Sequence, residues 1–188
     1  QGGRLYGGFW QRMSSQDRQE NVLIDGDCVI ELDYGQMSLA ILYGIAGKTP
    51  AEGDLYDLSA FGIPVQYRKG LKKCIQAIVN SPNVPKRVPK GVRQHLPKSC
   101  SMTDILRAVE QKHSAIYQLM TSGRGMQLFR KESDILIDVL LTLKSKGTTA
   151  QPIHDAVVVW DDKSDKAKAV MEKVFERHKG ITPDVSLG

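Results

Sequence analysis

VIELDYGQMSL, residues 29–39, joins an apolar run typical of a β-strand to the start of a run rich in Leu, Ile and Ala that is typical of a buried helix. The strand-like part ends at Asp33, and the helix-like part, residues 36–46, is followed by Gly47, a common helix stop. Upstream, Asp25-Gly26 is typical of a tight turn between two strands. The stretch therefore predicts a hairpin and a buried helix, with an aspartate at the junction between them.

A second aspartate, Asp155, lies in another strand-like run, residues 153–160. Two carboxylates at the ends of short strands, far apart in sequence, suit a shared metal site, because Mg²⁺ prefers oxygen ligands and is often held by one or two carboxylates and substrate phosphates. A pair of such ions can stabilise the attacking and leaving oxygens of phosphoryl transfer. We therefore expect Asp33 and Asp155 to be metal ligands and catalytic residues.

Four further helices are predicted from apolar residues at helical spacing, over residues 66–80, 103–120, 127–146 and from Ser164 onward. Between the first two, residues 82–100 contain four prolines, which predicts an extended loop. A few short strands among several helices indicate an α+β fold, with a small sheet backed by helices.

The net charge of +5 is distributed unevenly. Residues 58–103 contain nine Lys or Arg and no Asp or Glu, so subtracting nine charges from +5 leaves −4 for the rest of the chain. Such a block typically binds phosphate, in a nucleic-acid backbone or a triphosphate. The alternative is a solvated basic surface. We expect the basic loop to contact nucleic acid through Lys86, Arg87, Lys90 and Arg93.

Composition places the chain among ordinary globular proteins, with 41% hydrophobic and 25% charged residues. It has no apolar stretch long enough to cross a membrane and no signal-peptide pattern. Its three cysteines form no Cys-x-x-Cys pair, so neither a disulfide framework nor a zinc site is indicated. We expect an intracellular protein, cytoplasmic or nucleoid-associated, without a membrane partner. Because the sequence begins with Gln1, part of a longer polypeptide is also expected.

The order of these motifs resembles that of the palm and fingers of family A DNA polymerases and of the related single-subunit, phage-type RNA polymerases. The resemblance extends over nearly the whole chain. It rests on Gly3-Arg4-Leu5 with Gln11 downstream, Asp33–Leu39 (similar to motif A), Arg68 with Lys72 (Arg-x-x-x-Lys of motif B), Ser133-Asp134-Ile135 (the helix before motif C) and Ile153–Val157 (motif C).

The resemblance implies an antiparallel palm sheet and a reduced helical fingers subdomain within one catalytic domain. Residues 1–57 would form a palm part with motif A, 58–103 a fingers-like segment, and 104–188 a palm part with motif C. It implies that Asp33 and Asp155 bind two Mg²⁺ ions, or Mn²⁺ in their place. The implied nucleoside triphosphate ligands are Arg68, Lys72, Ser38 and Tyr34, and the implied contacts to the nucleic-acid template and primer are Arg4, Gln11 and His154.

Several positions differ from the family pattern. Ser38 stands where family A DNA polymerases carry a Glu that excludes a ribose 2′-hydroxyl, and Ala156 stands where motif C has a Glu. Gln76 and Asn80 replace aromatic residues that follow the motif B lysine. Since Ser38 is small and can hydrogen-bond a hydroxyl, these differences favour ribonucleotides, as in a primase or a compact RNA polymerase, possibly phage or mobile-element encoded, while deoxyribonucleotide use stays open.

The leading hypothesis is therefore a magnesium-dependent, template-directed nucleotidyltransferase. The alternative is a non-catalytic nucleic-acid-binding module derived from a polymerase, because no thumb is recognisable and the aromatic positions are altered. A His–Asp metal phosphohydrolase is disfavoured, because none of the four histidines has metal-ligand spacing to another. Template type and oligomeric state are left open.

Overall fold

The computed structural model describes residues 5–188 and divides the chain into two compact units. Unit 1 comprises residues 1–44 and 128–188 and contains the sheet, whereas unit 2, residues 45–127, is helical in its described secondary structure. Arg4 lies outside the described residues, so its predicted contact with nucleic acid stays a prediction.

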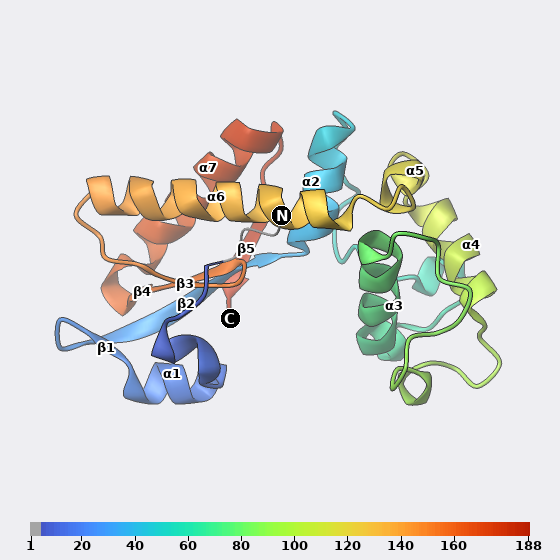
Figure 1. The fold of residues 1–188 in the computed structure, drawn as a ribbon, viewed down its shortest axis with the longest axis horizontal. Coiled ribbons are helices and arrows are strands. Elements are labelled where there is room, and N and C mark those ends of the chain that lie inside the picture. The colour runs from blue at the N-terminus through green and yellow to red at the C-terminus, as the bar shows by residue number, and fades with distance from the viewer. Residues whose placement is uncertain (1–4) are drawn as a thin grey trace. The chain divides into compact units, whose positions relative to one another are not determined.

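The sheet of unit 1 is antiparallel in every strand pair (Figure 1). Its order is β1-β2-β4-β3, and β5 also pairs with β2. The central strand β2 is thus hydrogen-bonded to three others, which fixes the position of motif A in the middle of the sheet. The strands are β1 (Leu23–Ile24), β2 (Asp27–Gly35), β3 (Gln151–Ile153), β4 (Ala156–Trp160) and β5 (Asp184–Leu187).

Turn chemistry sets the first hairpin. Asp25 and Gly26 have φ values of 54° and 93°, the left-handed conformations that a two-residue turn between twisted strands requires. The predicted hairpin is confirmed, and it brings Leu23 opposite Cys28.

Side chains of the sheet alternate between two covered faces, as the pleat requires. On one face, Val29, Ala156 and Val158 join a cluster that packs against Trp10 and Met13. The opposite face packs against α7, where the ring centroids of Tyr34 and Phe175 are 5.5 Å apart. In Figure 1, α1 lies on the other side of the sheet from α7.

The helices of unit 1 form where apolar spacing predicts them. They are α1 (Ser15–Asn21), α2 (Met37–Ile45), α6 (Gly125–Ser145) and α7 (Ser164–Lys179), with the short 3-10 turns η1 (Phe9–Arg12) and η5 (Asp161–Lys163). Asp138 of α6 accepts hydrogen bonds from Arg177 and His178 of α7. The predicted α+β fold, a small antiparallel sheet backed by helices, is confirmed.

Unit 2 is built around α3, whose buried side chains include Leu71, Cys74, Ile75 and Ile78. Its elements are η2 (Ser59–Phe61), η3 (Val65–Tyr67), α3 (Arg68–Asn80), η4 (Arg93–His95), α4 (Met102–Lys112) and α5 (Tyr117–Met120). The helix predicted over residues 103–120 is two helices, and the first is capped by Ser101, which exchanges hydrogen bonds with Asp104.

The basic segment 58–103 lies inside unit 2, which extends beyond it on both sides. The reason is packing: α4 contacts α3 and η2, and Lys112 at its C-terminus binds the backbone of residues 54 and 57. Among the described residues, no helix is both long and apolar enough to cross a bilayer.

Candidate active site

The register of the sheet brings the two predicted catalytic aspartates together. Asp33 of β2 is paired with Ala156 of β4, and Asp155 is the residue immediately before Ala156. Paired Cα atoms lie about 4.5–5.5 Å apart and consecutive ones 3.8 Å apart, so the Cα atoms of Asp33 and Asp155 are within about 9 Å. Both side chains are half-buried. Residues far apart in sequence therefore form one acidic pair at the end of the central strand.

A tight turn presents the second aspartate. His154 and Asp155 form the two-residue connection between β3 and β4, and His154 is exposed with φ 51°. Gln36, three residues after Asp33, also has a positive φ, of 61°. Such a conformation is uncommon for residues other than glycine and is often retained at functional sites. Both acidic positions therefore adjoin unusual backbone geometry.

The acidic pair has the donor chemistry for magnesium. Asp33 and Asp155 offer carboxylate oxygens, which Mg²⁺ prefers, and Mg²⁺ commonly completes its shell with water and substrate phosphates. Within residues 5–188, no three His, Cys, Asp or Glu side chains cluster as a metal site of their own. The two aspartates thus fit a metal that is shared with a bound triphosphate.

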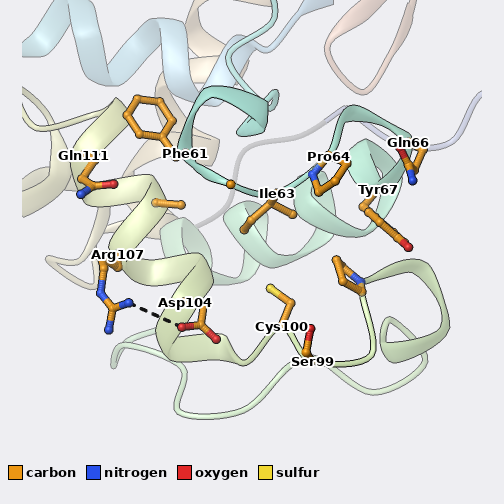
Figure 2. Close-up of a pocket in the computed structure, with 13 residues that line it drawn as sticks. Phe61, Ile63, Pro64, Gln66, Tyr67, Ser99, Cys100, Asp104, Arg107 and Gln111 are labelled. Carbon is orange, nitrogen blue, oxygen red and sulfur yellow. Dashed lines mark ion pairs between the residues drawn. The ribbon is translucent and has the colours of Figure 1, made fainter.

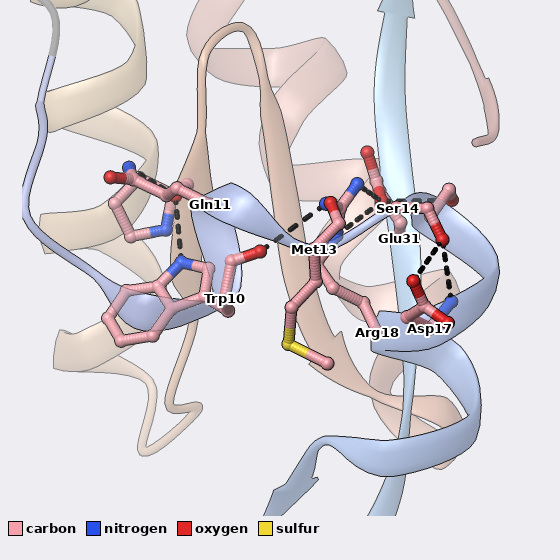
Figure 3. Close-up of polar contacts among 9 residues, drawn as sticks. Trp10, Gln11, Met13, Ser14, Asp17, Arg18 and Glu31 are labelled. Atoms are coloured by element: carbon pink, nitrogen blue, oxygen red, sulfur yellow. Dashed lines mark hydrogen bonds and ion pairs between the residues drawn. The ribbon is translucent and has the colours of Figure 1, made fainter.

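Residues 10 and 11 anchor the β3–β4 hairpin that carries Asp155 (Figure 3). The carbonyl oxygen of Pro152 accepts hydrogen bonds from Trp10 Nε1 at 3.1 Å and from Gln11 Nε2 at 3.0 Å. The Gln11 amide also donates to Leu5 O and accepts from the backbone N–H groups of Gly7 and Gly8.

These four contacts correct one sequence-based prediction. A glutamine amide has two N–H donors and one carbonyl oxygen with two lone pairs, and in Gln11 each of them has a partner inside unit 1. Gln11 is therefore occupied in positioning the hairpin, and we do not retain it as a nucleic-acid contact.

A buried ion pair fixes the same N-terminal segment to β2. Arg18 of α1 is 7% exposed and pairs with Glu31 at 2.6 Å, while it also donates to the carbonyl oxygens of Trp10 and Met13. Figure 3 shows this arginine between the two backbone segments. Removing one partner of such a buried pair typically costs about 3–5 kcal/mol, so Arg18 is a structural residue of the site.

Ser38 is closer to an acid than the sequence suggests. Its Oγ donates a 2.6 Å hydrogen bond to Oε1 of Glu132 on α6, and Glu132 is only 3% exposed. The glutamate that position 38 lacks is thus supplied from a residue almost a hundred positions later. Sequence analysis missed Glu132, because no local pattern shows that α6 meets α2 at this point.

Tyr34 has a different role from the predicted one. Its side chain is 1% exposed, and its hydroxyl donates a 2.7 Å hydrogen bond to Met171 O in α7. Burial, together with the nearby Glu172, strongly raises the pKa of Tyr34. Tyr34 therefore belongs to the contact between sheet and helix, and we do not retain it as a nucleotide ligand.

In unit 2, Arg68 and Lys72 share one face of α3, as their spacing predicts. Arg68 Cζ and Lys72 Nζ each lie 5.6 Å from the centroid of the Tyr56 ring. Arg68 also donates through Nε and Nη2 to the carboxylate of Asp54. The two cations are therefore held beside one aromatic ring and one acid, neither of which sequence analysis singled out.

The basic loop is only partly available to a ligand. Lys86, Arg87 and Lys90 are exposed. Arg93, in contrast, donates hydrogen bonds to the carbonyl oxygens of Pro97, Lys98 and Cys100. Because these bonds fold the loop back on itself, we assign Arg93 a structural role and retain the other three as predicted nucleic-acid contacts.

A cavity of about 470 Å³ in unit 2 lies apart from these cations along the chain surface (Figure 2). Phe61, Ile63 and Pro64 form one side, and Cys100, Asp104 and Arg107 belong to its other lining. Arg107 is paired with Asp104 at 3.6 Å. Neither Arg68 nor Lys72 lines this cavity, so it is distinct from the predicted triphosphate site.

No protein-family model matches the sequence, and no curated protein matches it. Solved structures do match. One is the polymerase domain of Pol1 from M. smegmatis, in complex with a DNA primer-template and dNTP, with a TM-score of 0.55 and 12% identity. The chain has a polymerase-like fold.

The likeness covers 91% of this chain but only 41% of the Pol1 chain, so this chain spans less than half the length of that neighbour. At this identity the likeness concerns the fold. It supports the polymerase part of the resemblance and does not favour an RNA polymerase or a primase in particular.

Proposed function

We propose that the protein is a magnesium-dependent, template-directed nucleotidyltransferase. The observation that carries the proposal is the pairing of Asp33 with Ala156, which places the Asp155 carboxylate beside that of Asp33 at the end of the central strand. A polymerase-like fold around this acidic pair supports it. The substrates would be nucleoside triphosphates, and the partner a nucleic-acid template and primer.

Each group has a distinct part in the proposed chemistry. Asp33 and Asp155 hold Mg²⁺, which supplies charge stabilisation for the attacking and leaving oxygens when bound. Arg68 and Lys72 bind phosphate oxygens of the triphosphate, and the exposed His154 contacts the primer or template. Catalysis then consists mostly of positioning and of electrostatic stabilisation of the charge that develops on phosphate.

Ser38 and Glu132 together would govern sugar selection. A ribose 2′-hydroxyl that loses a partner in a buried site costs about 1–3 kcal/mol, or roughly five- to over a hundredfold in rate. Ser38 alone favours ribonucleotides, whereas the buried Glu132 behind it restores an acid at the same place. Competition between matched ribo- and deoxyribonucleotides, in the wild type and in Glu132→Gln, measures this balance; an unchanged ratio removes Glu132 from sugar selection.

Primer extension tests the proposed function. Asp33→Asn and Asp155→Asn should abolish incorporation while leaving the fold intact. Asp25→Asn and Asp161→Asn are matched controls, because these residues lie at the other ends of the same two strands. The controls should extend like the wild type. Near wild-type extension by Asp33→Asn and Asp155→Asn refutes the catalytic assignment.

The alternative function, a non-catalytic nucleic-acid-binding module, predicts another pattern. The exposed cations of residues 86–90 favour nucleic-acid binding regardless of catalysis. If the wild type binds primer-template but extends no primer with Mg²⁺ or Mn²⁺, the module replaces the enzyme as the better description.

A further inference from the structure

Asp54 grips one edge of the Arg68 guanidinium. The carboxylate accepts from Nε and from Nη2, so it is bidentate. An arginine has five N–H donors in a rigid plane. Asp54 takes two of them, and the other three are then directed away from the acid. A planar group held along one edge has a fixed orientation, and its opposite edge suits phosphate oxygens.

Asp54 is itself held in place by α4. Lys112 Nζ donates to Asp54 O at 2.8 Å and to Asp57 O at 2.5 Å, and His113 Nε2 donates to Leu55 O at 2.9 Å. His113 is fully buried. The side chain of Asp54 also accepts from the backbone N–H of Tyr56 at 3.0 Å. The loop that carries Asp54 is therefore a rigid support.

Tyr56 places the second cation. Its side chain is 3% exposed, and its ring lies 5.6 Å from both Arg68 Cζ and Lys72 Nζ. A cation this close to an aromatic ring is attracted by the negative potential of the ring face. Two cations share this ring, and Asp54 balances only one of them, so the group as a whole carries a positive charge and attracts an anion.

Helix stability does not account for these cations. Arg68 and Lys69 occupy the first turn of α3, which contains no acid. Cations at a helix N-terminus oppose the helix dipole, whereas anions there are stabilised. An exposed ion pair such as Arg68–Asp54 contributes about 0–1 kcal/mol to stability. The cluster therefore costs more as a structural device than it returns, unless an anion binds to it.

We propose that Asp54 and Tyr56 are positioning residues that preorganise Arg68 and Lys72 for the phosphate groups of a nucleoside triphosphate. The inference rests on the proposed function for the identity of the ligand, but the cluster lies entirely within unit 2. Preorganisation matters because ordering a long side chain on binding costs affinity. Neither Asp54 nor Tyr56 needs to touch the triphosphate.

Direct titration of the full chain with inorganic tripolyphosphate and with a nucleoside triphosphate, without primer, tests the proposal. By calorimetry, Asp54→Asn should weaken the binding of both by roughly three- to tenfold. Asp57→Asn is the matched control: its carboxylate belongs to the same loop but accepts from Ser59 rather than from Arg68. Its affinity should stay within about twofold of the wild type. Thermal unfolding confirms that each variant is folded.

Double substitution separates positioning from a general effect on structure. In an Arg68→Ala background, Asp54→Asn should cause no further loss of affinity, because the two residues act as one unit. Tyr56→Phe keeps the ring and should bind like the wild type, whereas Tyr56→Leu should bind more weakly. Should Tyr56→Leu fail to fold, Asp54→Asn and Tyr56→Phe still decide the matter.

Three results overturn the proposal: Asp54→Asn binds like Asp57→Asn, it loses affinity equally with and without Arg68, or it binds more tightly, which would make Asp54 a competitor for Arg68. The proposed function fails separately. Asp54-dependent tripolyphosphate binding without primer extension retains this inference and rejects the enzyme. Primer extension with a nucleotide KM that Asp54→Asn leaves unchanged does the opposite.

Discussion

Gln11→Glu probes the anchor of the hairpin that carries Asp155. The change keeps the size of the side chain and an oxygen at Oε1, but it replaces the two donated hydrogen bonds, to Leu5 O at 2.9 Å and Pro152 O at 3.0 Å, with an acceptor facing two carbonyl oxygens. Each part-buried bond contributes about 0.5–1.5 kcal/mol, so we expect a loss of about 1–3 kcal/mol. For a chain of this size, that lowers Tm by about 2–12 °C.

Circular dichroism melts measure the shift, and hydrogen exchange at residues 151–156 should show that the hairpin opens more often. Gln19→Glu, on the exposed surface of α1, is the control for the added charge and should stay within about 0.5 kcal/mol of the wild type. A Gln11→Glu protein that melts like the control, yet binds primer-template more weakly, would refute the positioning role and restore Gln11 as a nucleic-acid contact.

Three further predictions follow from buried or committed side chains. Tyr34→Phe removes the hydrogen bond to Met171 O and should lower the free energy of unfolding by about 1–3 kcal/mol without changing the nucleotide KM; a raised KM with unchanged stability contradicts the core assignment. Burial lowers the pKa of His113 from 6.5 to about 4, so the unfolded chain takes up a proton that the folded protein excludes, and stability present above pH 6.5 should be lost as the pH falls towards 4, by on the order of 3 kcal/mol. Urea unfolding at pH 7, 5.5 and 4.5 measures this, and a His113→Gln protein with the same pH dependence as the wild type argues against it; His95→Gln is the control. Replacing Lys86, Arg87 and Lys90 together should flatten the log–log salt dependence of duplex binding by up to about 0.9 per lost contact, whereas Arg93→Ala should act mainly through thermal stability; an unchanged slope in the triple variant returns the loop to a solvated surface.

Local patterns were sufficient for much of the fold. The Asp25-Gly26 turn, the buried helix after Asp33 and the amphipathic face of α3 each depend on residues a few positions apart, so sequence alone predicts them. The boundary within residues 103–120 was wrong, because Ser101 and the break after Lys112 are set by capping and by contacts with the 54–57 loop. Hydrophobic periodicity does not record such contacts.

The sequence by itself determined the acidic pair and the Arg68–Lys72 pair as candidates, because chemistry and spacing are visible in one dimension. Only the tertiary structure decided which polar groups are already committed: Gln11 to Pro152 and Tyr34 to Met171. It also placed Glu132 against Ser38 and Asp54 against Arg68. The physical reason is that a side chain's hydrogen-bonding capacity is limited, and packing between segments distant in sequence decides whether the protein or a ligand uses it.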